Sequence, residues 1–373
     1  MKTRENAAAA AEREHPGRRL GRGIGRGLLM FFTFVAALLI LLLAVLKMFC
    51  SEAFPNVQRT FVTTMLETGQ MKFMASLFLS ADEIQAIVDE NSMESFNVAV
   101  DTNLIQIDNI KSMDMTAGGA QGEAEEQKDI EIVEVAGATY TGTMMIVKDP
   151  SRVSLATIYP WREEGVTLDE LVDTNDAIGG INGGIYDSYN NSGGKPFGVV
   201  VCNGEIQYNR PQEIIGLVLI GLTEDNILQI VDLSGMMAKD VEKLVEDMKI
   251  RDAVTFQEEA SDANNHFVQL MINGEAREMN GLGSGLNPRT AIGQRADGTL
   301  LLFVTDGRGK SGHLGASSAD LISVMKDFDA VNAANLDGGS SSCMYYEGEY
   351  LMPSVTFYHA NSSWKLPLAF IVK

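Results

Sequence analysis

The pattern of apolar and polar positions divides this chain into a helical N-terminal part and a strand-rich remainder. Residues 27–46 carry no charge and are rich in Leu, Phe, Ala and Val, and such a run is long enough for a helix that crosses a bilayer. Residues 56–91 then place apolar side chains at helical spacing. Within them, Ser80-Ala81-Asp82-Glu83 has the sequence of a capping box that begins a second short helix. We expect a transmembrane helix over 27–46 and a helical stalk over 47–110.

From residue 130 onward the pattern changes to short apolar runs typical of strands. Helices are predicted at 168–173, 239–248 and 319–328, the first behind another capping-box sequence, Thr167–Glu170. Asn203-Gly204 predicts a hairpin turn. Because many connections are too short for helical crossovers, the pattern favours an α+β fold with a mixed, largely antiparallel sheet and flanking helices. Strands are expected at 130–135, 143–147, 153–158, 199–202, 205–208, 217–222, 227–231, 299–305 and 368–372.

Between these two parts lies a segment with the composition of a linker. Residues 111–128 contain few apolar side chains, several glycines and a run of acidic residues, which is typical of a solvated, flexible stretch. The sequence therefore predicts five regions: a basic tail over 1–26, the membrane helix, the stalk, this linker and one domain over 129–373.

The charge distribution indicates an orientation and excludes one class of partner. The net charge is −21, yet residues 1–50 hold eight Lys/Arg and only three Asp/Glu. Basic residues upstream of a membrane helix favour a cytoplasmic N-terminus, so the rest of the chain is expected outside the cell. A cleaved signal peptide is the competing interpretation, but its apolar region is usually shorter and Lys47–Cys50 is a poor cleavage site. The acidic remainder repels polyanions, which argues against nucleic-acid binding.

The cysteines and acidic loops give no clear sign of a metal or cofactor. Cys202 and Cys343 are compatible either with one disulfide or with two buried free thiols, and Cys50 lies at the membrane edge. No CxxC or His/Cys cluster suggests zinc, and no EF-hand-like spacing signals a divalent cation. We expect no cofactor.

Four glycine-containing segments carry the candidate chemistry. In each, an apolar run typical of a strand is expected to stop at Asn, Asp or Arg next to Gly. Strands hold side chains rigidly, and Gly lets backbone N–H groups approach a ligand closely. Two arginines and two aspartates at such strand ends suggest a site for a phosphate and for a reaction that needs carboxylates. The segments are Asn182-Gly183-Gly184, Asn287–Gly293 (NPRTAIG), Asp306-Gly307-Arg308 and Asn335–Ser341 (NLDGGSS).

Taken in order, these segments resemble the motifs of the phosphodiester glycosidase family, whose bacterial relatives are often labelled exopolysaccharide biosynthesis proteins. The resemblance covers roughly residues 130–373. It implies an enzyme that hydrolyses a sugar-1-phosphodiester to a free sugar and a phosphomonoester, and an α+β fold that gathers the motifs in one cleft. In one departure, Trp364 or Lys365 stands where the family usually has an arginine. In another, Ile185-Tyr186 follows Gly184 in place of the usual aromatic pair.

Arg289 and Arg308 are the candidate phosphate ligands, because a guanidinium presents paired donors to two phosphate oxygens. Ordinary buried salt bridges are the alternative for both. Asp337 and, second, Asp306 are the candidate catalytic carboxylates, since glycosidic cleavage uses a carboxylate at the anomeric carbon. An Asx-turn is the alternative for Asp337.

The remaining candidates are expected to bind substrate, or to act as acid or base, from the same loops. Asparagine, threonine and serine side chains could hydrogen-bond the sugar or the phosphate, and glycines could offer backbone N–H groups to an anion. Plain turn chemistry is the alternative for the asparagines, and a surface position without function is the alternative for the histidines. The residues are Asn182, Asn287, Asn335, Thr290, Ser340, Gly183, Gly184, Gly338, Gly339, His313 and His359.

These observations favour a membrane-anchored extracellular hydrolase that cleaves a sugar-1-phosphodiester bond in a bacterial cell-surface glycopolymer or glycoconjugate. A second hypothesis is a non-catalytic surface module that binds sugar-phosphates for exopolysaccharide assembly, motivated by the missing terminal arginine. A third is another hydrolase on the same scaffold, acting for example on a peptidoglycan sugar.

Overall fold

The computed structural model describes residues 16–68, 71–94, 96, 98–107, 129–355 and 361–373. The chain divides into two compact units, residues 1–58 and 59–373, and each is described by itself. The predicted linker at 111–128, most of the predicted basic tail and His359 lie outside the described residues.

The first unit is dominated by one long helix, α2 (Pro16–Phe49). Its segment Ile24–Phe49 is long and apolar enough to cross a membrane, and it contains the span predicted at 27–46. A signal sequence near the N-terminus can also form a helix this long and apolar, so this helix fits either a single-pass membrane protein or such a sequence.

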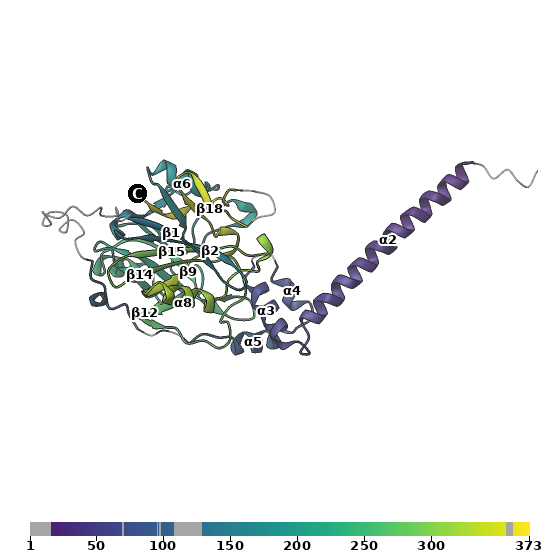
Figure 1. Cartoon of the computed structure of the whole chain (residues 1–373), viewed down its shortest axis with the longest axis horizontal. Coiled ribbons are helices and arrows are strands. Elements are labelled where there is room, and N and C mark those ends of the chain that lie inside the picture. The colour runs from purple at the N-terminus through teal and green to yellow at the C-terminus, as the bar shows by residue number, and fades with distance from the viewer. Residues whose placement is uncertain (1–15, 69–70, 95, 97, 108–128, 356–360) are drawn as a thin grey trace, which may run out of the picture. The chain divides into compact units, whose positions relative to one another are not determined.

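The second unit is built from antiparallel sheets (Figure 1). The largest has seven strands in the order β1 (Ile130–Ala136), β2 (Thr141–Val147), β15 (Leu300–Thr305), β14 (Thr290–Arg295), β16 (Ala330–Asn335), β12 (Gln269–Ile272) and β13 (Glu275–Ala276). A second sheet runs β18 (Glu349–Met352), β17 (Met344–Tyr346), β4 (Gly179–Asn182), β19 (Leu368–Val372) and β3 (Val153–Thr157). A third runs β6 (Glu205–Asn209), β5 (Val199–Cys202), β9 (Ile250–Gln257), β7 (Leu217–Thr223) and β8 (Leu228–Asp232). A short ribbon pairs β10 (Glu259–Ala260) with β11 (Asn265–His266).

One hydrophobic core joins these three sheets. Buried side chains from all of them form a single cluster, including Met145 of β2, Phe370 of β19 and Val254 of β9. Strands that face apolar neighbours on both sides have no polar face, which is why β7 and β15 are buried at every position. The α+β fold with a largely antiparallel sheet is therefore confirmed.

Helices cover the other faces of the sheets. α8 (Ser318–Asp327) packs against β16 and β12, α6 (Leu168–Thr174) against β4 and β19, and α7 (Ala238–Asp247) lies next to β6. Each helix contributes apolar side chains to a local cluster, and α8 is visible in front of the large sheet in Figure 1. The predicted helices at 168–173, 239–248 and 319–328 are confirmed.

The two predicted capping boxes have different outcomes. Ser80 caps α5 (Ala81–Glu90) with both reciprocal bonds to Glu83. Thr167 precedes α6 but makes no side-chain cap, so that prediction is wrong. The first N–H groups of α6 instead meet tertiary partners: Leu168 N donates to Ser363 Oγ (2.8 Å) and Asp169 N to the Tyr350 hydroxyl (3.2 Å), which satisfies the helix end from outside.

The segment expected to be a stalk at 47–110 is, among its described residues, α-helical only as far as Glu90, and from residue 59 on it belongs to the strand-rich unit. It comprises most of α3 (Pro55–Leu66), α4 (Phe73–Ser76) and α5, which share a small apolar cluster. Hydrogen bonds tie it to the loop before β14: Thr64 Oγ1 accepts from Leu286 N (3.0 Å), and Glu94 N donates to Glu278 O (3.0 Å).

The strand predictions hold where apolar runs are continuous. All nine predicted strands are present with ends shifted by at most two residues, and the Asn203-Gly204 turn joins β5 to β6. β9, β12, β17 and β18 were not among the predictions.

The cysteines Cys50, Cys202 and Cys343 are buried and free, so no disulfide joins Cys202 to Cys343.

Candidate active site

The antiparallel register of three neighbouring strands brings three motifs to one edge of the seven-stranded sheet. β14 lies between β15 and β16, and its first residues pair with the last residues of both. Since both neighbours run against β14, the residue before β14 meets the residues that follow the other two strands. Arg289, Asp306 and Asp337 are held together at this edge.

One detail of the predicted arrangement is wrong. The apolar run near Arg289 was expected to stop there, but strand β14 begins at Thr290, just after it. Pro288 has no N–H to donate to a strand ladder, which places the strand after it. Arg289 therefore lies at the start of a strand, whereas Asp306 and Asn335 lie at strand ends as expected.

Asn182 links this edge to the second sheet. It is the last residue of β4 and is buried. Its Nδ2 donates to the Asp337 backbone oxygen (2.7 Å), and its Oδ1 accepts from Thr290 Oγ1 (2.7 Å) and from Cys343 N (3.1 Å). Asp337 N in turn donates to Gly183 O (3.2 Å). Asn182 and Thr290 thus hold the Asp337 loop in place, with their polar atoms used inside the protein.

Two further sequence candidates are also packed into the scaffold. A Cβ at Gly184 would lie 2.4 Å from the Thr255 backbone oxygen, so this glycine serves close packing against β9. Asn335 is buried and donates from Nδ2 to Phe267 O (3.0 Å). Neither residue presents its side chain or Cβ position to solvent.

Asp337 carries the most strongly perturbed carboxyl at this edge. Burial raises its pKa to about 7, against smaller opposing effects from the Ser341 hydroxyl, the Gly338 N–H and Arg308. Gly338 N donates to Oδ1 (3.0 Å), and Ser341 Oγ lies 3.0 Å from the buried Tyr186 hydroxyl. A carboxyl that changes charge near neutral pH is suited to catalysis. Tyr186, noted in the sequence only as a departure from the family pattern, supports the loop that carries it.

Arg308 is the accessible cation beside Asp337. The residue is exposed, and its Nη1 donates to Ser340 Oγ (2.7 Å). Partial burial and the nearby charge of Arg289 lower the Arg308 pKa, while Asp337 and Glu67 oppose that shift. An exposed guanidinium next to a serine hydroxyl can bind a phosphate through charge-assisted hydrogen bonds.

The glycines before Ser340 make room for that guanidinium. Gly339 has a φ of +65°, and a Cβ there would lie 2.5 Å from Arg308 Nη2. Its N–H donates to Pro288 O (2.8 Å), while a Cβ at Gly338 would lie 3.0 Å from the same oxygen. Gly339 therefore has both a conformational and a steric reason to be glycine.

Arg289 forms an ion pair with Glu67, a residue that is not among the sequence candidates. The two side chains form an ion pair and are 5% and 2% exposed. The Glu67 carboxylate also accepts from Gly285 N (2.7 Å) and Asn287 Nδ2 (3.2 Å). Burial raises the Glu67 pKa, and Arg289 is the largest opposing effect. Nothing in the local sequence signals Glu67, since it follows the end of α3 in a segment outside the family motifs.

Nε and Nη2 of Arg289 make further hydrogen bonds inside the protein. Its Nε donates to Ala316 O (3.0 Å), and its Nη2 donates to Gly285 O (2.6 Å) and Ser284 Oγ (3.0 Å). In this arrangement Arg289 fits the buried-salt-bridge alternative, because its Nη2 is paired with Glu67.

Asp306 is committed to two partners. It is buried, and its carboxylate accepts from Thr141 N (2.8 Å) and from Thr141 Oγ1 (3.1 Å). Its Oδ2 also lies 2.6 Å from His313 Nδ1. A carboxylate held this way can orient a histidine, but it is poorly placed to attack a substrate itself.

Lys365 and Trp364, at the position of the family's terminal arginine, have partners outside the four motifs. Lys365 Nζ pairs with Glu164 Oε2 at 2.5 Å, and Trp364 N donates to Ser354 Oγ (3.1 Å). The lysine charge is thus neutralised by Glu164.

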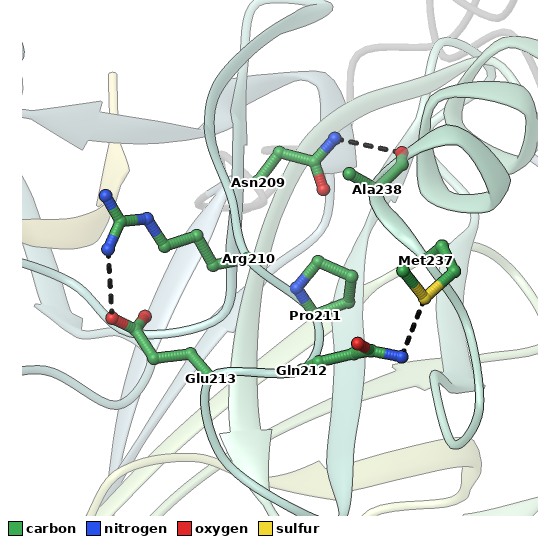
Figure 2. Close-up of a pocket in the computed structure, with 7 residues that line it drawn as sticks. All are labelled: Asn209, Arg210, Pro211, Gln212, Glu213, Met237 and Ala238. Carbon is green, nitrogen blue, oxygen red and sulfur yellow. Dashed lines mark hydrogen bonds and ion pairs between the residues drawn. The ribbon is translucent and has the colours of Figure 1, made fainter.

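A separate hollow of about 340 Å³ lies between β6 and the start of α7 and contains none of the motif residues. Figure 2 shows pairs among its lining residues, including Arg210 with Glu213 (3.6 Å) and Asn209 Nδ2 with Ala238 O (3.0 Å). Within the described part of the chain, no group of three or more His, Cys, Asp or Glu side chains is placed to hold a metal ion.

Several solved structures are similar to this chain at low sequence identity. A zebrafish N-acetylglucosamine-1-phosphodiester α-N-acetylglucosaminidase catalytic domain, auto-inhibited by its pro-peptide, is similar at 20% identity and a TM-score of 0.47, covering 68% of this chain and 87% of that one. An exported protein of Burkholderia pseudomallei shares 14% identity (TM-score 0.41; 62% and 74% covered). A hypothetical protein of Synechocystis shares 16% (TM-score 0.40; 65% and 61%).

A relative in Bacillus subtilis, the SPbeta prophage-derived uncharacterized protein YomE, is 43% identical over 65 residues. That match covers 17% of this chain and only 10% of the relative. The family model for phosphodiester glycosidases matches residues 175–373, which is more than half of the chain and includes all four motifs. The chain therefore belongs to the phosphodiester glycosidase family.

Proposed function

We propose that this protein is a membrane-anchored hydrolase that cleaves a sugar-1-phosphodiester bond in a cell-surface glycopolymer or glycoconjugate. The family supplies the reaction class. The observation that carries the proposal is the loop after β16, where Arg308 Nη1 donates to Ser340 Oγ (2.7 Å) three residues beyond Asp337. Burial raises the pKa of that Asp337 carboxyl to about 7.

Each of these two groups suits one half of a glycosyl phosphodiester. Arg308, with Ser340, binds the phosphate and neutralises its charge. Asp337 in its ionised form stabilises the positive charge that develops at the anomeric carbon. The departing phosphomonoester is a weak base, so the leaving oxygen needs little help from an acid. This explains how the site can work with one accessible carboxylate.

The sequence suggests that Arg289 and Asn287 bind the substrate, but in this proposal they do not contact the phosphate. Their donors hold Glu67, so we assign phosphate binding to Arg308 and a supporting role to Arg289.

The membrane location rests on α2. Its span Ile24–Phe49 is long and apolar enough for a bilayer, and arginines precede it in the sequence, which favours a cytoplasmic N-terminus and an exported catalytic unit. Protease added to intact cells should then remove a C-terminal epitope tag. Protection of the tag until the membrane is permeabilised would contradict this orientation.

The activity is tested with the full chain in detergent micelles and a panel of methyl phosphodiesters of hexose- and N-acetylhexosamine-1-phosphates. Mass spectrometry should detect free sugar and methyl phosphate with wild-type protein and neither with Asp337→Asn. Tight binding of a panel member with no product would instead favour the non-catalytic sugar-phosphate-binding module. Hydrolysis only of sugars without phosphate would favour another hydrolase on this scaffold.

A further inference from the structure

A buried aspartate holds an accessible histidine at the edge of the candidate site. Asp306 Oδ2 lies 2.6 Å from His313 Nδ1, and their side chains are 8% and 32% exposed. Thr141 completes the arrangement, since its Oγ1 lies 2.9 Å from the same ring nitrogen and 3.1 Å from Asp306 Oδ2. The Asp306 carboxylate is itself fixed by the Thr141 N–H.

These contacts determine which ring nitrogen is available for chemistry. An ionised carboxylate can only accept hydrogen bonds, so the hydrogen bond to Asp306 places the imidazole proton on Nδ1. The neutral ring then carries its lone pair on Nε2. No hydrogen bond joins Nε2 to any residue that the structure describes, and the ring is partly exposed. Such a histidine is prepared to accept a proton from a water molecule.

The backbone places this histidine beside Arg308. The loop after β15 folds back on itself, with Arg308 N donating to Leu314 O (3.0 Å) and Gly309 N to His313 O (2.6 Å). The residue proposed to bind phosphate and the histidine therefore lie on facing arms of one short loop. Arg308 and Gly309 both have positive φ, at +54° and +84°, which defines the tight shape of this loop.

We propose that His313 is the catalytic general base of the hydrolysis and that Asp306 is its positioning residue. This inference rests on the proposed function and names a second catalytic group for the same site. It also replaces the earlier expectation that Asp306 acts directly on the substrate.

The reaction balances without any further reagent. His313 Nε2 removes a proton from water as the water oxygen bonds to the anomeric carbon. The bond between that carbon and the phosphate oxygen breaks, and its electron pair stays with the phosphate. The products are the free sugar and a phosphomonoester, and the proton on Nε2 passes to the phosphomonoester or to solvent. Asp337 stabilises the transition state and stays unprotonated throughout.

The test compares full-length wild-type protein with His313→Gln, His313→Ala and Asp306→Asn on the best methyl phosphodiester of the panel. Glutamine at 313 can still donate to Asp306 from its amide but cannot take up a proton. We expect His313→Gln to lower kcat by about 100-fold or more with KM changed by less than about threefold. Asp306→Asn should lower kcat in the same direction, because it no longer stabilises the proton on Nδ1.

Added imidazole separates a chemical role from a structural one. It should restore kcat of His313→Ala by about tenfold or more, in a saturable manner, and should not restore Asp337→Asn. Retention of wild-type kcat by His313→Gln overturns the proposal. So does a loss in both His313 variants that appears only in KM, or a loss in His313→Ala that imidazole does not restore. If wild-type protein hydrolyses no member of the panel, the proposed function itself fails, whereas an active wild type with an active His313→Gln refutes only the base.

Discussion

Glu67 and Arg289 form an ion pair inside the protein although 222 residues separate them in sequence. Glu67 follows α3, and Arg289 immediately precedes β14 at the centre of the candidate site. The pair therefore attaches the segment before the strand-rich part of the chain to the edge where the motifs meet. Its removal should affect stability first and catalysis only as a consequence.

We predict that Arg289→Met destabilises the protein by about 3–5 kcal/mol, because it leaves the Glu67 carboxylate buried without its partner. Chemical denaturation followed by tryptophan fluorescence measures the change. The double variant Glu67→Leu with Arg289→Met removes both charges and should be markedly more stable than Arg289→Met alone. Equal stability of Arg289→Met and wild type would show that the pair contributes little and would reopen Arg289 for phosphate binding.

The ion pair between Glu67 and Arg289 also predicts where a soluble fragment must begin. A fragment of residues 59–373 keeps Glu67 and the bonds of Thr64 and Glu94 to the loop before β14. A fragment of residues 130–373 loses all of them and leaves Arg289 without its carboxylate. We expect the longer fragment to melt cooperatively and the shorter one to melt at a clearly lower temperature or to aggregate. Identical melting curves would contradict this account.

Asp337 should make the protein less stable as the pH rises. Its pKa is about 7 in the folded state and near 4 in the unfolded state, so between these values the folded state binds more protons. The free energy of unfolding therefore falls as the pH increases from about 4 to 7. Asp337→Asn removes this penalty, and we expect it to stabilise the protein on the order of 3 kcal/mol at pH 8 while abolishing activity. The gain should vanish near pH 4, and a gain that does not depend on pH would refute the assignment.

Arg308 should control substrate binding. Arg308→Gln removes a charge-assisted contact and should raise KM by about 10- to 100-fold. Gly339→Ala should produce a smaller defect in the same direction, because its Cβ would lie 2.5 Å from Arg308 Nη2 and the guanidinium would have to shift. Gly348→Ala is the matched control, since Gly348 also has positive φ (+90°) but no atom near the new Cβ. A KM unchanged in Arg308→Gln, or raised equally in both glycine variants, would contradict the role of Arg308.

The sequence predicts the elements well where one local signal dominates. Continuous apolar runs such as 217–222 and 368–372 appear as buried strands, and the Asn203-Gly204 turn forms its hairpin. β9 was missed because Arg251, Asp252, Thr255 and Gln257 interrupt its apolar residues, and the last three are buried. The cap of α6 was predicted wrongly, since its N–H groups find partners almost two hundred residues away, at Ser363 and Tyr350.

The candidate site shows the same limit. The motifs identify Asp337, Arg308 and Gly339, and the structure places them together. Local sequence could not distinguish an exposed arginine from a buried one, so Arg289 and Arg308 were both candidate phosphate ligands. It also could not show that Asp306 faces His313, because that contact depends on how the loop after β15 folds back.

The most direct test of the central claim is to run the hydrolysis of an active methyl phosphodiester in water enriched in oxygen-18. A phosphodiester glycosidase breaks the bond between the anomeric carbon and oxygen, so the methyl phosphate released should contain no oxygen-18. Methyl phosphate that carries the label would show cleavage at phosphorus and would contradict the account.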